Sequence, residues 1–231
     1  RGAGDANLSG RTVPYVGPQG ASSPVDPLRY LGELADGVAA AGVTRITGDV
    51  VGDDTKFPWQ PYAADWAADD LLWGYGAPVS ALSVNDNQIG LTITPGARAG
   101  DAAMVALDPA VPYYTLAASV TTVAAKAPDG VAIDRELGSK MLKVSGTIAA
   151  RSGVYADQVA IQDPAEYAAL ALKGMLEARG IRVDGRARAE HRMIPEPSNF
   201  LKETREALPT LPTAAMGSIS KVVTGGLTCF D

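Results

Sequence analysis

The segment DPAEYAALALKGMLEARGIRVDG, residues 163–185, has the pattern of a helix that leads directly into a strand. Asp163 is placed to cap free backbone N–H groups, Pro164 supplies a helical φ at the first position, and Glu166 stands where a capping-box carboxylate reaches back. Apolar residues recur at helical spacing until Gly180, a favoured helix stop, and an apolar strand pattern follows. This stretch predicts one helix–strand unit.

The same pattern occurs earlier in the chain. Asp26 and Pro27 predict a helix start, and Gly42 predicts its end before a strand over residues 43–51. The expected apolar stripe of this helix is Leu28, Leu31, Leu34 and Val38. Two helix–strand units favour an α/β layer with parallel strands, so we expect residues 43–51 and 181–189 to lie in one sheet.

The residues between the two units have a different character. Short β-type runs separated by Gly and Pro are typical of an antiparallel all-β module. These runs are residues 91–94, 103–107, 115–117, 131–133 and 142–148. The predicted fold class is therefore α/β, a mixed sheet with covering helices that carries an inserted small antiparallel all-β domain.

The expected domain boundaries follow from these patterns. Residues 1–90 and 162–195 form a discontinuous α/β domain, residues 91–161 form the inserted β domain, and residues 196–231 form an irregular C-terminal segment. The interval 53–87 is predicted to be a long, partly ordered connection that packs aromatic side chains over the sheet edge.

The tryptophans Trp59, Trp66 and Trp73 all fall within that connection. Their spacing of seven residues favours one buried helical face, as part of the core at the sheet edge. The alternative is an exposed aromatic platform, which suits contacts with sugars and peptides.

Composition excludes several classes of partner. The net charge is −6 and no Lys/Arg run is longer than two residues, so a nucleic-acid partner is not predicted. No apolar stretch reaches the roughly 18 residues of a membrane helix, so no transmembrane segment is expected in this chain.

Cys229 is the one cysteine, which excludes an intrachain disulfide and a cysteine-based metal site. Arg1 in place of a Met or a leader suggests a start inside a longer protein.

Few residues point to chemistry. His191 lies in an Arg/Glu-rich stretch with no acidic partner implied, so we expect a surface histidine at a strand end and no His-dependent triad. Asp49, Asp53 and Asp54 form a carboxylate cluster, but turn and cap chemistry explains it better than a cation, and no metal is predicted. The glycines of residues 1–5 lack the dinucleotide fingerprint, so no cofactor is predicted.

Ser218 and Lys221 form an S-x-x-K pattern, in which a helical turn places an amine beside a serine hydroxyl and activates it. The S-x-N and K-T-G elements that complete such a site do not follow, because the chain stops at Asp231. Ser83-Val84-Asn85 fits S-x-N but lies upstream, in the wrong order. We favour coincidence and predict no catalytic residue, with Ser218 and Lys221 as the alternative.

Five segments carry a family resemblance. They are residues 1–9, 42–57, 75–87 (YGAPVSALSVNDN), 163–168 and 176–185. In this order they resemble the penicillin-binding protein 4 family of D-alanyl-D-alanine carboxypeptidases/endopeptidases, and the thirteen-residue match at 75–87 is the most specific. The similarity spans roughly Arg1 to His191.

The resemblance implies a periplasmic or otherwise extracytoplasmic protein that trims peptidoglycan through a serine acyl-enzyme, which β-lactams also acylate. In this family the S-x-x-K pair precedes the first segment, and S-x-N and K-T-G follow the last. The chain is therefore identified as the accessory inserted domains, whose partners are the rest of a parent penicillin-binding protein and, through it, peptidoglycan peptides. Two alternatives stay open: a peptidoglycan- or partner-binding module without an enzymatic role, and a hydrolase that uses Ser218 and Lys221.

Overall fold

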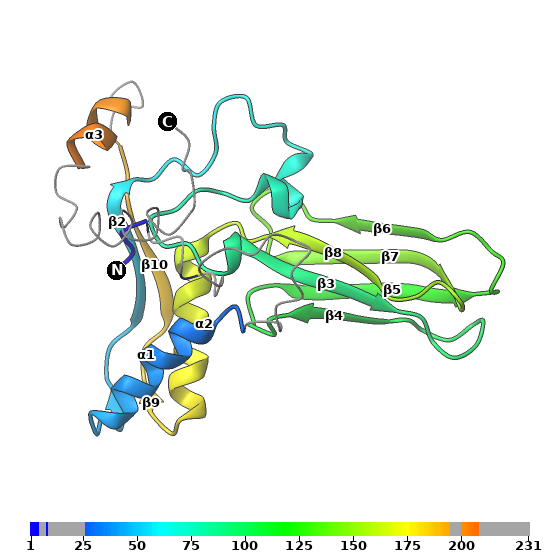
Figure 1. Cartoon of the computed structure of the whole chain (residues 1–231), viewed down its shortest axis with the longest axis horizontal. Helices are drawn as coiled ribbons and strands as arrows, with labels where there is room; N and C mark the ends of the chain where they lie inside the picture. Colours follow the sequence, from blue (N-terminus) through cyan, green and yellow to red (C-terminus); the bar gives the residue numbers. More distant parts are fainter. Residues whose placement is uncertain (5–7, 9–25, 195–199, 208–231) are drawn as a thin grey trace, which may run out of the picture.

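The computed structural model describes residues 1–4, 8, 26–194 and 200–207. The chain forms a mixed α/β structure with several small sheets and few helices. An α/β body lies at one end, and strands β3 to β8 project from it as an elongated arm (Figure 1). We call residues 88–160 the β arm.

The body is built from the two helix–strand units. Helix α1 (Arg29–Ala40) precedes β1 (Arg45–Ile46) and β2 (Val50–Pro58), and α2 (Pro164–Ala178) precedes β9 (Arg182–Val183) and β10 (Ala187–Arg192). β1 pairs in parallel with β9, and β2 pairs in parallel with β10. Residues 43–51 and 181–189 thus pair directly, as two short ladders, which confirms the expected parallel pairing.

The α2 helix begins as predicted. Asp163 Oδ1 accepts a hydrogen bond from the Glu166 N–H at 3.0 Å, and Pro164 is the first helical residue. Gly42 and Gly180 follow α1 and α2 with φ of 77° and 79°, the left-handed region that glycine enters without steric cost. The Glu166 carboxylate does not complete a capping box, because it forms an ion pair with Lys140 of the arm.

Two expectations for α1 were wrong. The helix begins at Arg29 and not at Pro27, although Asp26 Oδ1 accepts the free Leu28 N–H at 2.8 Å, as expected of a capping carboxylate. Leu34 is 56% exposed, whereas Leu31 and Ala35 are buried. The buried face of α1 is directed at α2, and Leu34 falls outside that contact.

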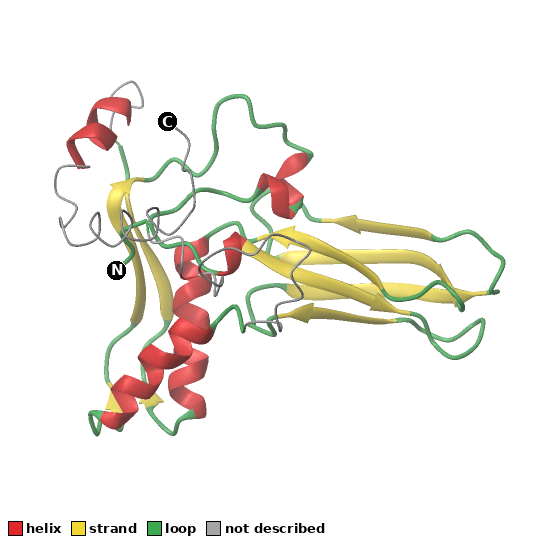
Figure 2. Ribbon diagram, viewed as in Figure 1, coloured by secondary structure: helices red, strands yellow, loops and turns green. Residues whose placement is uncertain are grey.

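Helix α2 packs closely on β2. A Cβ atom on Gly52 of β2 would lie 1.9 Å from the backbone oxygen of Ala165, so only glycine permits this approach. Helix α2 contacts both β2 and β10, and α1 lies along α2 (Figure 2). Helix α2 covers the face of the β2–β10 ladder that is turned toward the arm, and α1 packs on α2.

The β arm contains two three-stranded sheets. One has the order β4 (Met104–Asp108), β3 (Gln88–Thr94), β8 (Tyr155–Ala160), and both pairings are antiparallel. The other has the order β5 (Thr115–Val123), β7 (Met141–Ala149), β6 (Gly130–Asp134). The prediction of a wholly antiparallel module was wrong, because β5 and β7 run parallel in a nine-residue register. None of the β-type runs predicted from the sequence covers β8.

The connection between β2 and β3 contains three short 3-10 turns, η2 (Asp70–Leu72), η3 (Gly74–Gly76) and η4 (Asn85–Asn87). Each residue of η4 has positive φ, between 52° and 58°, which Asn and Asp tolerate best among residues with a Cβ. The buried Asn87 stabilises this turn, since its side chain accepts from Val84 N–H and donates to the Pro78 carbonyl.

The largest apolar cluster continues from the arm into the body. Buried residues of β3, β7 and β8 share it with Tyr113, Tyr114 and the first turns of α2. A smaller cluster lies beneath α1 and α2, where Ala35, Leu176 and Ile181 meet Val50. The helix α3 (Phe200–Ala207) lies within the C-terminal segment that was predicted to be irregular, so that prediction was wrong at these residues.

Candidate functional site

His191 occupies the end of β10 and contacts two carboxylates. Its Nδ1 lies 2.8 Å from Asp54 Oδ1, and its Nε2 lies 3.1 Å from Asp163 Oδ2. The imidazole also stacks on the indole of Trp59, with ring centroids 3.9 Å apart. The expectation of a histidine without acidic partners was wrong, because the partners lie 137 and 28 residues away along the chain.

The environment of His191 favours the imidazolium form. Burial by itself lowers the pKa of His191, but the hydrogen bond with Asp54 and the charges of Asp163 and Asp54 outweigh burial and raise the pKa above its ordinary value. In the charged form both ring nitrogens carry a proton, and each donates to one carboxylate. Neither nitrogen then offers the lone pair that a general base requires.

Asp54 is the buried centre of this network. Its side chain is 2% exposed, and its second oxygen accepts the Ser80 hydroxyl at 2.9 Å. Ser80 Oγ in turn accepts the Leu82 N–H at 3.1 Å. Ser80 contacts Asp54 and not His191, so this arrangement is not that of a Ser-His-Asp triad. The network joins β2, β10, the start of α2 and the segment before η4.

The three aspartates predicted as one cluster point to different partners. Asp49 accepts from the Arg186 N–H and from Arg188 Nε, and these hydrogen bonds lower its pKa. Asp53 bonds to Thr55 and pairs with Arg1, whereas Asp54 points inward to His191. Within the described residues no three His, Cys, Asp or Glu side chains are grouped to hold a metal ion.

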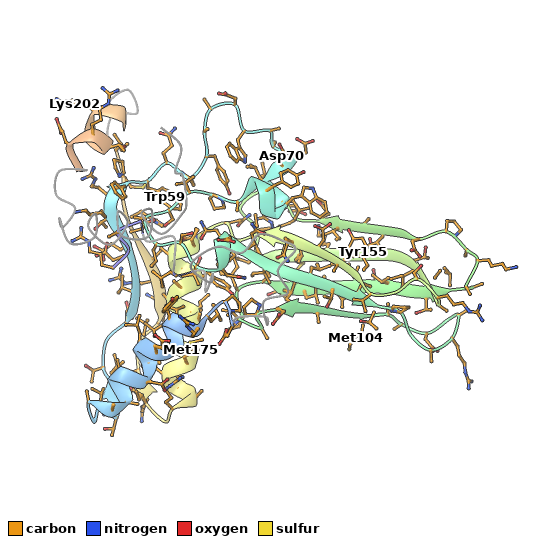
Figure 3. All side chains as sticks on the ribbon, viewed as in Figure 1. Trp59, Asp70, Met104, Tyr155, Met175 and Lys202 are labelled. Atoms are coloured by element: carbon orange, nitrogen blue, oxygen red, sulfur yellow. The ribbon has the colours of Figure 1, made fainter. Side chains whose placement is uncertain are left out.

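A cavity of about 470 Å³ opens beside this network. Aromatic and apolar side chains of β2 and of the segment after β2 form much of the cavity wall. Asp54 and two serines are among the polar residues that line the cavity. The lining residues are Gly4, Asp54, Phe57, Pro58, Trp59, Gln60, Val79, Ser80, Ala81, Ser83 and Thr204. Trp59 lies at the same end of the body as α3, which carries Lys202 (Figure 3).

The tryptophans do not share a helical face, so that part of the sequence prediction was wrong. Trp59 directly follows β2, and its N–H donates to the Arg192 carbonyl at 2.8 Å. Trp66 is 42% exposed in the following loop, and Trp73 forms a bridge with Val159 of β8. Of the three, only Trp59 lines the cavity.

The other candidate residues have structural partners or lie outside the described part of the chain. Ser83 donates to the Asn87 side chain and Asn85 to the Gln88 carbonyl, so both serve the η4 turn. The N–H groups of Gly2 and Gly4 donate to Asp53 and Ala81 carbonyls. Ser218, Lys221 and Cys229 lie outside the described residues. None of the described helices is long and apolar enough to span a bilayer.

Comparison with known proteins identifies the family. The family sequence model described as D-Ala-D-Ala carboxypeptidase 3 (S13) family matches residues 1–211 of this chain. The chain belongs to this family. The S13 chain is 31% identical over 172 residues to a D-alanyl-D-alanine carboxypeptidase of Actinomadura sp. (strain R39), a match that covers 72% of this chain and 32% of that protein.

A solved structure shares the fold. The crystal structure of penicillin binding protein 4 (dacB) from Haemophilus influenzae superposes with a TM-score of 0.58 at 19% sequence identity. The match covers 71% of this chain and 36% of that one. The S13 chain therefore spans about a third of the length of the relatives it matches.

Proposed function

We propose that this S13 chain is a non-catalytic accessory part of a serine D-alanyl-D-alanine carboxypeptidase/endopeptidase that remodels peptidoglycan. The main support is the family match over residues 1–211 in a chain that spans only 32% of its carboxypeptidase relative. The geometry of the described residues agrees, because His191 is engaged by two carboxylates and the Ser80 hydroxyl donates to Asp54. Neither side chain is set up for acyl transfer.

The domain organisation that we propose has residues 91–161 inserted between the halves of a discontinuous α/β domain, residues 1–90 and 162–195. Its support is the chain path: the chain leaves the body after β2, forms the β arm, and returns at α2, after which β10 pairs with β2. The inserted part is a β domain of mixed strand direction.

The partners follow from the same proposal. The remainder of the parent penicillin-binding protein supplies the nucleophilic serine and its activating lysine, and peptidoglycan peptides are bound through that parent. The site of action is periplasmic or otherwise extracytoplasmic, as suits a family of D-Ala-D-Ala carboxypeptidases.

The test uses intact-mass spectrometry of the 231-residue chain after incubation with benzylpenicillin, together with an assay of D-Ala release from a D-Ala-D-Ala peptide. We expect no covalent adduct and no release, whereas the full-length parent does both. A stoichiometric adduct that disappears in Ser218→Ala would overturn the proposal and make Ser218 and Lys221 a working site.

A second candidate function is binding of peptidoglycan peptides or of a partner protein. The observation in its favour is that Trp59 and Phe57 line an open cavity of about 470 Å³. Calorimetric titration of the chain with a peptidoglycan stem peptide tests it, with Trp59→Ala as the variant and Trp66→Ala, outside the cavity, as the matched control. Binding that Trp59→Ala leaves unchanged contradicts this candidate.

A further inference from the structure

Three loops meet at the end of the β arm that lies farthest from the body (Figure 1). They are residues 95–103 between β3 and β4, 124–129 between β5 and β6, and 150–154 between β7 and β8. We call these residues the tip. The Gly100 N–H donates to the Thr122 carbonyl at 2.8 Å, and the Ala150 N–H donates to the Val123 carbonyl at 3.0 Å. Main-chain hydrogen bonds to the end of β5 therefore hold the loops together.

Each loop of the tip carries one cation. Arg98, Lys126 and Arg151 come from the three loops in turn, and all three are exposed. Each lies within three residues of the main-chain contacts at the end of β5. None of them has a carboxylate partner within the part of the chain that the structure describes. Three unpaired positive charges thus lie at one end of the molecule.

The two carboxylates of the tip serve the loops themselves. Asp101 Oδ2 accepts the Arg98 N–H at 2.8 Å. Asp129 Oδ1 accepts the Ala149 N–H at 2.6 Å and the Ser152 hydroxyl at 2.9 Å, and these hydrogen bonds lower the pKa of Asp129. Three cations and two carboxylates give the tip a formal charge of +1, which leaves −7 for the rest of a chain whose total is −6.

The other exposed side chains of the tip are small and apolar. They are Ala97, Ala99, Ala102, Ala124, Ala125, Pro128 and Val154. Val154 is the largest of them and is 59% exposed. Short side chains let the loops approach a surface closely, while the long stems of lysine and arginine carry their charges to anionic groups on that surface.

The length of the arm separates the tip from the negative charge of the body. Strands β5 and β7 have nine residues each, which span roughly 30 Å at about 3.3 Å per residue. Charges in physiological salt are screened over about 8 Å. The negative charge of the body therefore does not cancel the attraction between the tip and an anionic surface.

We propose that the tip docks the chain, arm first, on a membrane surface of anionic phospholipids. The tip is the projecting end of an elongated arm, and its cations come from three separate loops, which suits a flat surface (Figure 1). An anionic polymer is instead tracked by cations along a groove. Arginine binds phosphate oxygens through its planar fork of N–H donors, and lysine binds them as a point charge. The docking goes beyond the proposed function and does not depend on it.

The expected strength of the contact follows from the number of cations. Each lysine or arginine near an anionic membrane raises the bound fraction relative to the free fraction by roughly fivefold. The two carboxylates of the tip offset part of the gain from Arg98, Lys126 and Arg151. Binding should therefore be weak, reversible and sensitive to salt.

Vesicle flotation with the full chain tests the docking. The vesicles contain either phosphatidylglycerol mixed with phosphatidylcholine or phosphatidylcholine alone, at roughly 20 mM and roughly 200 mM salt. We expect binding to the phosphatidylglycerol vesicles at low salt, a strong decrease at high salt, and no binding to phosphatidylcholine alone.

Two triple variants of equal net charge separate the tip from the charge of the whole chain. The tip variant combines Arg98→Gln, Lys126→Gln and Arg151→Gln, and should bind roughly tenfold less or weaker. The body variant combines Arg29→Gln, Arg182→Gln and Lys202→Gln, whose side chains are 49%, 73% and 74% exposed. The body variant should bind like the parent chain, and equal losses in the two variants overturn the proposal.

A fluorescent label shows which end of the chain meets the membrane. An environment-sensitive dye is attached to a cysteine introduced at Ala125 in the tip or at Ala40 at the end of α1, with Cys229 replaced by serine. Phosphatidylglycerol vesicles should shift the emission to the blue only for the dye at Ala125. A shift only at Ala40, or binding to soluble polyphosphate without binding to vesicles, overturns the proposal.

Discussion

The indole of Trp59 lies against the imidazole of His191 at a centroid distance of 3.9 Å and an interplanar angle of 22°. The two residues come from segments that neighbour each other only because β2 and β10 pair in parallel. The stack covers one face of an imidazolium whose edges are bonded to Asp54 and Asp163. An aromatic ring, a cation and two anions thus form one unit at the edge of the cavity.

Trp59 fluorescence is expected to report the charge of His191. An imidazolium in ring contact accepts an electron from excited indole and quenches it, whereas neutral imidazole quenches weakly. Emission should rise as the pH increases through the raised pKa of His191. Steady-state fluorescence titration measures this, and Trp59→Phe, which leaves Trp66 and Trp73 in place, should remove the transition. A transition that persists in Trp59→Phe contradicts the assignment.

His191→Ala is expected to destabilise the fold by about 2–3 kcal/mol near neutral pH, because it leaves the buried Asp54 carboxylate without its charged partner. The folded-state pKa of His191 is raised, so its contribution is complete below 6.5 and is lost as the pH rises through the folded pKa. Urea unfolding of both chains at several pH values measures the difference. Glu190→Ala serves as the exposed control, and a difference that grows with pH would contradict the charge assignment.

Asp163→Ala is expected to cost more than a helix cap alone, about 2 kcal/mol, because the same carboxylate caps α2 and pairs with His191. Asp163→Asn retains an oxygen for the Glu166 N–H and should cost about 1 kcal/mol or less. Denaturant melts of the two variants separate the cap from the charge. Equal losses would mean that the cap contributes little, and no loss for Asp163→Asn would mean that the pairing with His191 contributes little.

Gly52→Ala is expected to destabilise the body by about 2 kcal/mol or more, because the added Cβ would lie 1.9 Å from the Ala165 backbone oxygen and separate α2 from β2. Gly174 offers a matched control inside α2, since nothing lies within 4 Å of its added Cβ. Gly174→Ala should stabilise the chain by up to about 1 kcal/mol through helix propensity. Thermal melts measure both, and similar melting temperatures for the two variants would be evidence against close α2–β2 packing.

Local signals in the sequence predicted several elements correctly. The Asp163 cap, the helix stops at Gly42 and Gly180 and most strands of the arm depend on residues close to one another in the chain. Such features are set by short-range hydrogen bonds and backbone preferences, and they can be predicted without knowledge of the fold. Local signals did not predict β8, and they placed Leu34 on the apolar stripe of α1 although it is exposed. Strand pairing and burial both depend on which distant segments pack against a residue.

The family and the two helix–strand units could be recognised in the sequence alone, because contiguous patterns carry both. The parallel pairing of the two units was expected from their order in the chain, and it is a long-range contact of the fold. Tertiary structure alone decided the parallel β5–β7 pair and the environment of His191. No local pattern indicates which distant carboxylates approach an imidazole: Asp54 lies 137 residues from His191, and only the β2–β10 pairing brings them to 2.8 Å. Electrostatic interactions depend on distance and burial in space, so the charge of His191 and its contacts with Asp54 and Asp163 follow from the fold.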